Sequence, residues 1–248
     1  SPDTMSWHSP GRTFVPPRYQ LFTIFRLSNY EPICMRPRRL HPDQHNLVKD
    51  EIEKMLSAGV IAPCESPWAF PILLVDKPDG SKRFCVDFRK LNERMPKDNY
   101  PLPNIDEILD SLGGCRVFTK LDLFSGYWQV RLSRECQKYA CFVCKFGTYC
   151  FLVTPYGLRN APATFQRMMH EVFHDFDFVI AYMDDVIVFS IDYQAHFQHL
   201  DKVFERLADK GLRIKLSKCE LVQQHVHFLG HVVTFGGIAT DSSKISAI

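Results

Sequence analysis

Two adjacent acidic residues, Asp184 and Asp185, lie between two apolar runs in the segment F-V-I-A-Y-M-D-D-V-I-V-F-S, residues 178–190. The two runs predict a hairpin with both carboxylates at its tip or just beside it. Carboxylates about 5 Å apart repel by roughly 3 kcal/mol at an effective dielectric of about 20. This repulsion is large against a total stability of about 5–15 kcal/mol, so a buried pair needs compensation.

Two explanations of the pair remain open from these residues alone. In the first, the tip is solvated, water screens the repulsion, and Asp is simply a favourable turn residue. In the second, a divalent cation balances the charge, because carboxylate oxygens suit Mg²⁺, which completes its shell with phosphate and water oxygens.

The second explanation needs a third carboxylate from a neighbouring strand. Asp122, in F-T-K-L-D-L-F-S-G-Y-W, is the candidate, because it also ends an apolar strand, which Ser125 and Gly126 then interrupt. Three carboxylates brought together in this way are typical of a two-metal phosphoryl-transfer site.

The surrounding segments predict the elements that would position these residues. Helices are predicted over residues 42–59, 104–113, 158–176 and 193–210. Asp43 and Asn104 are the predicted N-caps of the first two, and Gly211 closes the last. Apolar runs predict strands at residues 68–75, 83–88 and 116–123, and a hairpin over 138–153 that turns near Phe146-Gly147. This order indicates an α+β fold, with an antiparallel sheet and helices packed on one face.

Composition limits the possibilities only in part. The chain of 248 residues, 46% of them hydrophobic, is long enough for one large domain or two intimate subdomains. A formal net charge of +2 neither requires nor excludes a polyanionic partner. Residues 1–22 resemble a loose leader, and neither a signal peptide nor a membrane span is expected. Nine scattered cysteines are typical of reduced thiols in a cytosolic protein.

Two clusters invite comparison with zinc sites: Cys136, Cys141, Cys144 and Cys150, and His225, His227 and His231. In an extended strand Cys141 and Cys144 point to opposite faces, which is poor chelating geometry. The histidine cluster has no fourth ligand nearby. Neither cluster is therefore expected to bind a metal.

The acidic motifs Y-M-D-D and L-D-L-F-S-G-Y resemble the active site of reverse transcriptases. Further segments resemble the polymerase of gypsy-type long-terminal-repeat retrotransposons: S-P-W-A-F-P-I-L-L-V, D-G-S-K-R-F-C-V-D-F-R-K-L-N, Y-P-L-P-N-I-D-E-I-L-D, Y-G-L-R-N-A-P-A-T-F-Q and H-F-L-G-H-V-V. The likeness runs from about Phe25 to the last residue. It implies a right-hand polymerase with fingers at residues 23–96 and 130–160, palm at 97–129 and 161–236, and the start of a thumb at 237–248.

The resemblance also implies roles for single residues near the acidic motifs. Asp122, Asp184 and Asp185 match the catalytic, metal-binding carboxylates. The Leu123 carbonyl would add a metal oxygen. The backbone N–H groups of Ser125 and Gly126 would meet the triphosphate.

Four more residues match nucleotide-binding positions. Tyr127 matches the aromatic gate that excludes a 2′-hydroxyl, although core packing beside Trp128 is the simpler interpretation without the motif. Arg83 matches an arginine that binds the triphosphate. Lys77 lies near a fingers lysine, one residue out of step with the retroviral pattern. Tyr156 replaces the glutamine of retroviral enzymes, as is usual in gypsy-type relatives.

Phe228, Leu229, Gly230 and His231 match the primer grip, with an ordinary core hairpin as the alternative. Lys218 lies where the family has a lysine proposed to protonate pyrophosphate. An isolated surface lysine is the favoured interpretation there.

The resemblance implies an RNA-directed DNA polymerase that uses Mg²⁺, or Mn²⁺ in its place, with a primed RNA or DNA template and deoxynucleoside triphosphates as partners. It also implies a cytoplasmic retroelement particle, and the chain would be the fingers and palm of a longer polyprotein. The rival hypothesis is a catalytically silent remnant that binds nucleic acid or nothing. An RNA-directed RNA polymerase is less compatible, because Tyr127 should exclude ribonucleotides.

Overall fold

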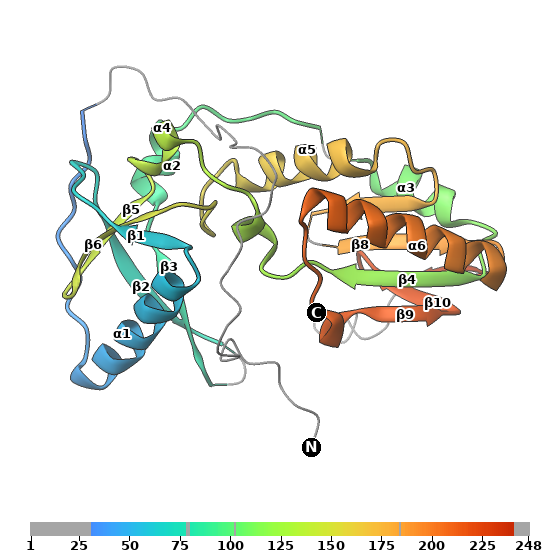
Figure 1. Ribbon diagram of the computed structural model, residues 1–248, viewed down its shortest axis with the longest axis horizontal. Coiled ribbons are helices and arrows are strands. Elements are labelled where there is room, and N and C mark those ends of the chain that lie inside the picture. The colour runs from blue at the N-terminus through green and yellow to red at the C-terminus, as the bar shows by residue number, and fades with distance from the viewer. Residues whose placement is uncertain (1–30, 78–79, 102, 184, 241–248) are drawn as a thin grey trace. The chain divides into compact units, whose positions relative to one another are not determined.

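The computed structural model describes residues 31–77, 80–101, 103–183 and 185–240. It divides into two compact units, drawn in Figure 1. The first contains the described residues of Ser1–Asp98 together with Tyr127–Ala161, and the second contains those of Asn99–Gly126 and Pro162–Ile248. The leader expected at residues 1–22 and the last eight residues of the chain lie outside the described part.

The first unit is built on a five-stranded sheet of order β1-β6-β5-β2-β3. Its strands are β1 (Ile61–Pro63), β2 (Phe70–Asp76), β3 (Lys82–Val86), β5 (Cys141–Cys144) and β6 (Gly147–Phe151). β2 and β5 are parallel, and the other pairs are antiparallel. The helices of this unit are α1 (Pro42–Ser57), α2 (Arg89–Arg94) and α4 (Arg134–Gln137), and η1 (Gly126–Gln129) is a 3₁₀ turn at its boundary.

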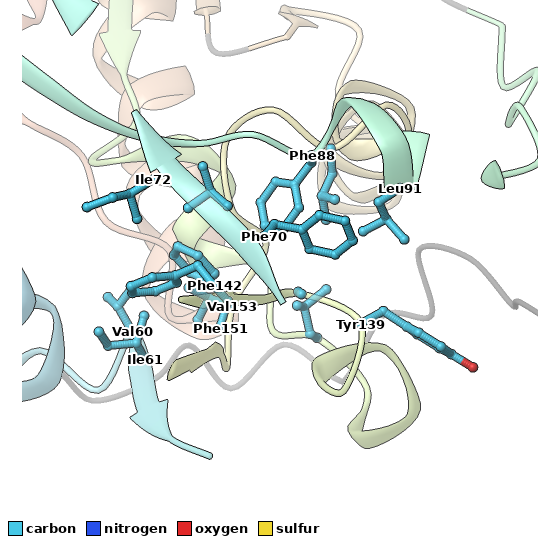
Figure 2. Close-up of a cluster of buried hydrophobic side chains, with 14 of the residues drawn as sticks. Val60, Ile61, Phe70, Ile72, Phe88, Leu91, Tyr139, Phe142, Phe151 and Val153 are labelled. Atoms are coloured by element: carbon cyan, nitrogen blue, oxygen red, sulfur yellow. The ribbon is translucent and has the colours of Figure 1, made fainter. Parts of the chain in front are cut away.

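Aromatic residues fill the core of the first unit (Figure 2). Phe70 and Phe88 meet edge to face with ring centroids 5.5 Å apart, and Phe142 packs in the same way against Phe84 at 5.5 Å. Such pairs add specific geometry to the burial of large apolar surfaces. The core therefore holds the five strands together mainly through hydrophobic burial.

The second unit contains a four-stranded antiparallel sheet of order β7-β8-β4-β9 and a three-stranded sheet of order β10-β11-β12. The strands are β4 (Val117–Asp122), β7 (Val179–Tyr182), β8 (Asp185–Ser190), β9 (Glu220–Gln223), β10 (His225–Phe228), β11 (His231–Thr234) and β12 (Gly237–Thr240). The helices are α3 (Ile105–Leu112), α5 (Ala161–Phe173) and α6 (Tyr193–Lys210), with a 3₁₀ turn η2 (Leu216–Lys218). Together these elements confirm the predicted α+β class.

Strand register assigns the residues of β4 and β8 to two faces of the sheet. Thr119 pairs with Val188 across the two strands. It contacts His196 of α6, which runs across these strands in Figure 1. Phe118 pairs with Phe189, and both lie on the opposite side of the sheet, in a core cluster with α3, β10 and β11. Because side chains alternate along a strand, Lys120 and Asp122 share the face of Phe118. The sequence predicts helices on one face of the sheet; α6 covers the face of Thr119, whereas α3 packs on the opposite face.

Two helix ends follow the predicted local chemistry. The Asn104 side chain accepts a hydrogen bond of 3.0 Å from the Asp106 N–H group, as expected for an N-cap. Gly211 has a left-handed backbone with φ of 68°, as expected for the residue that closes α6. Both predictions are confirmed.

One predicted N-cap and one predicted helix start are wrong, and proline explains both. Asp43 is not the N-cap of α1, because the helix already begins at Pro42 and His41 is the capping residue. The helix predicted from residue 158 begins only at Ala161, so that Pro162 lies in its first turn. Proline has no N–H group and fits the first turn but not the interior of a helix.

One predicted turn is also misplaced by a residue. The hairpin of β5 and β6 turns at Lys145-Phe146, because Cys144 pairs with Gly147 across the ladder. Phe146 was predicted as part of this turn, whereas Gly147 belongs to β6.

Candidate active site

The structure places two of the three predicted carboxylates opposite one another. Asp122 ends β4, Asp185 begins β8, and the two residues are direct partners in the antiparallel ladder. Directly opposed side chains have Cβ atoms about 4.5–5.5 Å apart. Both carboxylates are about one-third exposed, at 32% and 35%. Asp184 lies outside the described residues.

A tight turn brings Asp185 to this position. Tyr182 and Asp185 pair at the end of the β7–β8 ladder, so the turn of this hairpin begins at Met183. Met183 has φ of 52°, in the left-handed region. Such a backbone costs a non-glycine residue roughly 1–2 kcal/mol, so other contacts must hold the turn in place.

A lysine side chain lies beside each described carboxylate. Lys120 Nζ is 3.1 Å from Asp185 Oδ2, and Lys218 Nζ is 3.8 Å from Asp122 Oδ2. The ammonium groups offset part of the repulsion between the two carboxylates. The sequence reasoning missed Lys120, although its position two residues before Asp122 in a strand puts both on one face.

Lys218 is 59% exposed, yet it has a carboxylate partner in the site. The sequence favours an isolated surface lysine at this position, and the structure instead pairs Lys218 with Asp122. Its role as a general acid stays a prediction.

The backbone that follows Asp122 is tied to a neighbouring segment. The Phe124 N–H group donates to the Arg213 carbonyl at 2.9 Å, and the Lys215 N–H group donates to the Asp122 carbonyl at 2.8 Å. Within the loop, the Gly126 N–H group donates to the Leu123 carbonyl at 3.3 Å. Ser125 has φ of 51°, which turns the chain sharply just after β4.

The primer-grip candidates form a tight hairpin in the same unit. Phe228 pairs with His231, and the turn residues Leu229 and Gly230 have φ of 49° and 82°. Two positive φ values are typical of a type I′ turn. The Tyr182 ring meets the Phe228 ring edge to face, with centroids 6.4 Å apart. This contact joins the hairpin to the one that carries Asp185.

Lys120 adds a second connection between these two hairpins. Its Nζ donates to the His227 carbonyl at 3.4 Å while it also pairs with Asp185. The second unit therefore gathers the two carboxylates, two lysines and the candidate primer-grip hairpin.

The remaining nucleotide-binding candidates belong to the first unit. The rings of Tyr127 and Tyr156 lie 5.2 Å apart at an angle of 57°. Arg83 is exposed on β3, opposite Val75 of β2. Lys77 follows β2, and its N–H group donates to the Ser81 carbonyl at 2.8 Å. Within the first unit, Tyr127 and Tyr156 thus lie against each other, and Arg83 lies on β3 and Lys77 directly after β2.

Within the described ranges, no group of three or more His, Cys, Asp or Glu residues is arranged to hold a metal ion. Asp122 and Asp185 provide two adjacent and partly exposed carboxylates. This oxygen set fits Mg²⁺, which commonly takes only one or two protein carboxylates.

Comparison with known proteins gives a consistent result. A family profile described as reverse transcriptase (RNA-dependent DNA polymerase) matches residues 75–233. The chain is 38% identical over 232 residues to the retrovirus-related Pol polyprotein from transposon 297 of Drosophila melanogaster, covering 91% of this chain and 22% of that protein. It is 36% identical over 234 residues to the polyprotein from transposon gypsy of the same fly, with the same coverage of 91% and 22%. The chain thus spans about a fifth of the length of these relatives.

Solved structures are similar to the chain over most of its length. A foamy viral protease-reverse transcriptase in complex with an RNA/DNA hybrid matches with a TM-score of 0.84 and 23% identity, covering 93% of this chain and 31% of that chain. The native prototype foamy virus protease-reverse transcriptase matches with a TM-score of 0.77 and 26% identity, covering 88% and 30%. In the described part of the chain, no helix is long and apolar enough to cross a membrane.

Proposed function

Because the chain belongs to the reverse transcriptase (RNA-dependent DNA polymerase) family and is an RNA-directed DNA polymerase domain, we propose that it adds deoxynucleotides to the 3′-hydroxyl of a primer on an RNA or DNA template. The observation that carries this proposal is the direct pairing of Asp122 with Asp185 across β4 and β8.

The fingers would be residues 23–96 and 130–160, most of the first unit. The palm would be residues 97–129 and 161–236, most of the second unit, and residues 237–248 would begin a thumb. The division of the described residues into two compact units, with boundaries near residues 98, 126 and 161, supports this assignment.

Asp122, Asp184 and Asp185 would hold Mg²⁺, with Mn²⁺ as a substitute, and the Leu123 carbonyl would add an oxygen. When bound, the metal lowers the pKa of the attacking hydroxyl and stabilises the triphosphate. The adjacent, partly exposed carboxylates Asp122 and Asp185 support this role.

The triphosphate would be bound from several directions. Arg83 and Lys77 would bind its oxygens through charge-assisted hydrogen bonds. The N–H groups of Ser125 and Gly126 would also donate to it. For Gly126 this means giving up its 3.3 Å bond to the Leu123 carbonyl.

Tyr127 would exclude the 2′-hydroxyl of a ribonucleotide, with Tyr156 packed against it. The 5.2 Å separation of the two rings supports a shared aromatic surface. Removal of the gate side chain should therefore admit ribonucleotides.

The hairpin at Phe228, Leu229, Gly230 and His231 would hold the primer terminus, and Lys218 would protonate the departing pyrophosphate. The Tyr182–Phe228 contact supports the first role, and the approach of Lys218 to Asp122 supports the second. A primed template would be the partner, and the RNA/DNA hybrid bound by the similar foamy viral protease-reverse transcriptase supports this. A retroelement particle in the cytoplasm is the corresponding location.

Primer extension tests the proposal. The chain, and a longer version that includes the residues after 248, should extend oligo(dT) on poly(rA) with deoxythymidine triphosphate and Mg²⁺. Asp185→Asn, which removes charge but little volume, should abolish extension. The proposal fails if neither version extends the primer, or if Asp185→Asn is as active as the unchanged chain.

A metal titration separates the rival hypothesis. An intact site should give a Mg²⁺- or Mn²⁺-dependent rise in Tm in the presence of nucleotide, which Asp185→Asn should reduce. A silent remnant should give no metal-dependent shift in either protein.

A further inference from the structure

Gln166 of α5 is a buried polar side chain with both ends of its amide in use. It is 3% exposed and lies next to Phe165 on the apolar stripe of the helix. Its Oε1 accepts a hydrogen bond of 2.9 Å from the Met183 N–H group, and its Nε2 donates at 2.8 Å to the Ala181 carbonyl. The amide therefore spans the backbone on both sides of Tyr182.

The two bonds reach the hairpin where its own ladder ends. Tyr182 and Asp185 are the last pair of β7 and β8, so the Met183 N–H group, the first of the turn, has no ladder partner. Met183 also has a left-handed backbone with φ of 52°, a conformation that persists in a non-glycine residue only where surrounding contacts determine it. Gln166 supplies such a contact.

We propose that Gln166 is a positioning residue for the reaction: it fixes the backbone of Met183 and thereby the position of Asp185. This inference rests on the proposed polymerase function. Asp185 follows the turn directly, so a change in the Met183 backbone moves Asp185 relative to Asp122. Displacement of a reacting group by about 1 Å can cost roughly 100-fold in rate.

A neighbouring threonine offers a matched control. Thr164 lies on the same helix, is 1% exposed, and its Oγ1 has no hydrogen-bond partner among the described residues. Thr164→Val removes a buried polar group from α5 without removing a bond to the hairpin. It should leave turnover and the hairpin unchanged.

Two variants test Gln166 itself. Gln166→Met keeps the length of the side chain and removes both hydrogen bonds. Gln166→Asn keeps the amide but is one methylene shorter, so it cannot reach both Met183 and Ala181. The shorter, neutral and polar variant also serves if the methionine variant does not fold.

The first measurement is hydrogen exchange at the Met183 amide, which needs no activity. Exchange should accelerate at least about tenfold in both Gln166 variants, since the amide loses its acceptor. Thr164→Val should exchange at the rate of the unchanged chain. Unchanged Met183 exchange in a folded Gln166 variant overturns the inference.

The second measurement is steady-state primer extension. The kcat should fall about 10- to 100-fold in the Gln166 variants while KM for the primed template changes little, because positioning acts on the reacting groups. The Mg²⁺ concentration for half-maximal rate should rise as well. A structural role alone would lower Tm and leave kcat and the Mg²⁺ dependence of the folded enzyme unchanged, and that result also overturns the inference.

The two proposals fail in different ways. If the unchanged chain and its longer version do not extend primers, the polymerase function fails, and the exchange experiment still decides whether Gln166 holds the turn. If the unchanged chain extends primers and a folded Gln166 variant retains its kcat, only the positioning role fails.

Discussion

The two units of the molecule place polar groups differently. In the first unit, the sheet packs through aromatic rings such as Phe70, Phe88 and Phe142, which are almost completely buried. In the second, both faces of β4 carry polar chemistry: Asp122 is on one face and Thr119 on the other. The comparison indicates that both units depend on hydrophobic packing, and that the second adds buried polar contacts between its strands and α6.

The buried polar contacts of the second unit join four of its elements. The Val222 N–H group donates to Thr119 Oγ1 at 3.0 Å, and Thr119 Oγ1 lies 2.8 Å from His196 Nε2. Ser190 Oγ lies 2.9 Å from both His196 Nδ1 and His199 Nδ1. A neutral His196 that accepts a hydrogen bond from Thr119 and donates one to Ser190 lets every polar group of this hydrogen-bond network have a partner.

The largest effect is expected from the carboxylate of β4. Asp122→Asn should lower primer extension by at least about 10³-fold with little change in Tm, because the change removes charge and keeps volume. The control is Asp175→Asn in the same unit, whose carboxylate pairs with Arg206 at 2.8 Å. Equal losses of activity in the two variants would contradict a special role for Asp122.

In the first unit, a substitution in the aromatic core should lower the stability of the fold. Phe142→Ala should lower the free energy of unfolding by about 3–5 kcal/mol, because it leaves a cavity at a fully buried position. Phe197→Ala, at a side chain that is 55% exposed, should change it by no more than about 0.5 kcal/mol. Denaturant unfolding measures both, and a similar cost for the two would refute the contrast.

Mild acid should act on the second unit through His196. Burial and nearby His199 lower the pKa of His196 from 6.5 to about 4. The unfolded chain therefore binds the proton first, and stability that is present above pH 6.5 is lost as the pH falls toward 4. The loss should reach about 2 kcal/mol at pH 5, measured by denaturant unfolding.

His196→Gln should flatten this pH dependence between 6.5 and 4. The same substitution at exposed His225 is the control and should leave it intact. If His196→Gln keeps the full pH dependence of stability, other groups cause that dependence. His199 is one of them, because burial also lowers its pKa.

The smallest effect is expected from the buried carboxylate of the first unit. Hydrogen bonds from Arg89, helped by the charge of Arg38, lower the pKa of Asp87 from 3.8 to about 2. Its contribution is present above pH 3.8 and is lost as the pH falls toward 2. Asp87→Asn should cost about 1–2 kcal/mol at pH 7 and remove this acid-dependent loss, as unfolding from pH 2 to pH 5 would show.

The Asp87 variant should lose stability only between pH 6.5 and 4, and the His196 variant only below pH 4. This result would confirm that the two units respond to acid separately. A common window in both would contradict the comparison.

Local patterns in the amino-acid sequence determined the elements that carry the site. Apolar runs predict the two strands, with Asp122 near the end of one and Asp185 beside the start of the other. Asn104 and Gly211 mark helix ends because their preferences depend on the backbone within one turn. The family resemblance, carried by the acidic motifs, also needed only the order of residues.

Contacts between distant residues could be decided only by the tertiary structure. Sequence alone does not give the register that sets Asp122 opposite Asp185, or the two hydrogen bonds of Gln166 to a hairpin fifteen to seventeen residues away. Lys120 shares a predictable face with Asp122, but its pairing with Asp185 depends on the neighbouring strand. The physical reason is that strand propensity and helix caps are local energies, whereas register and side-chain pairing depend on how separate elements pack.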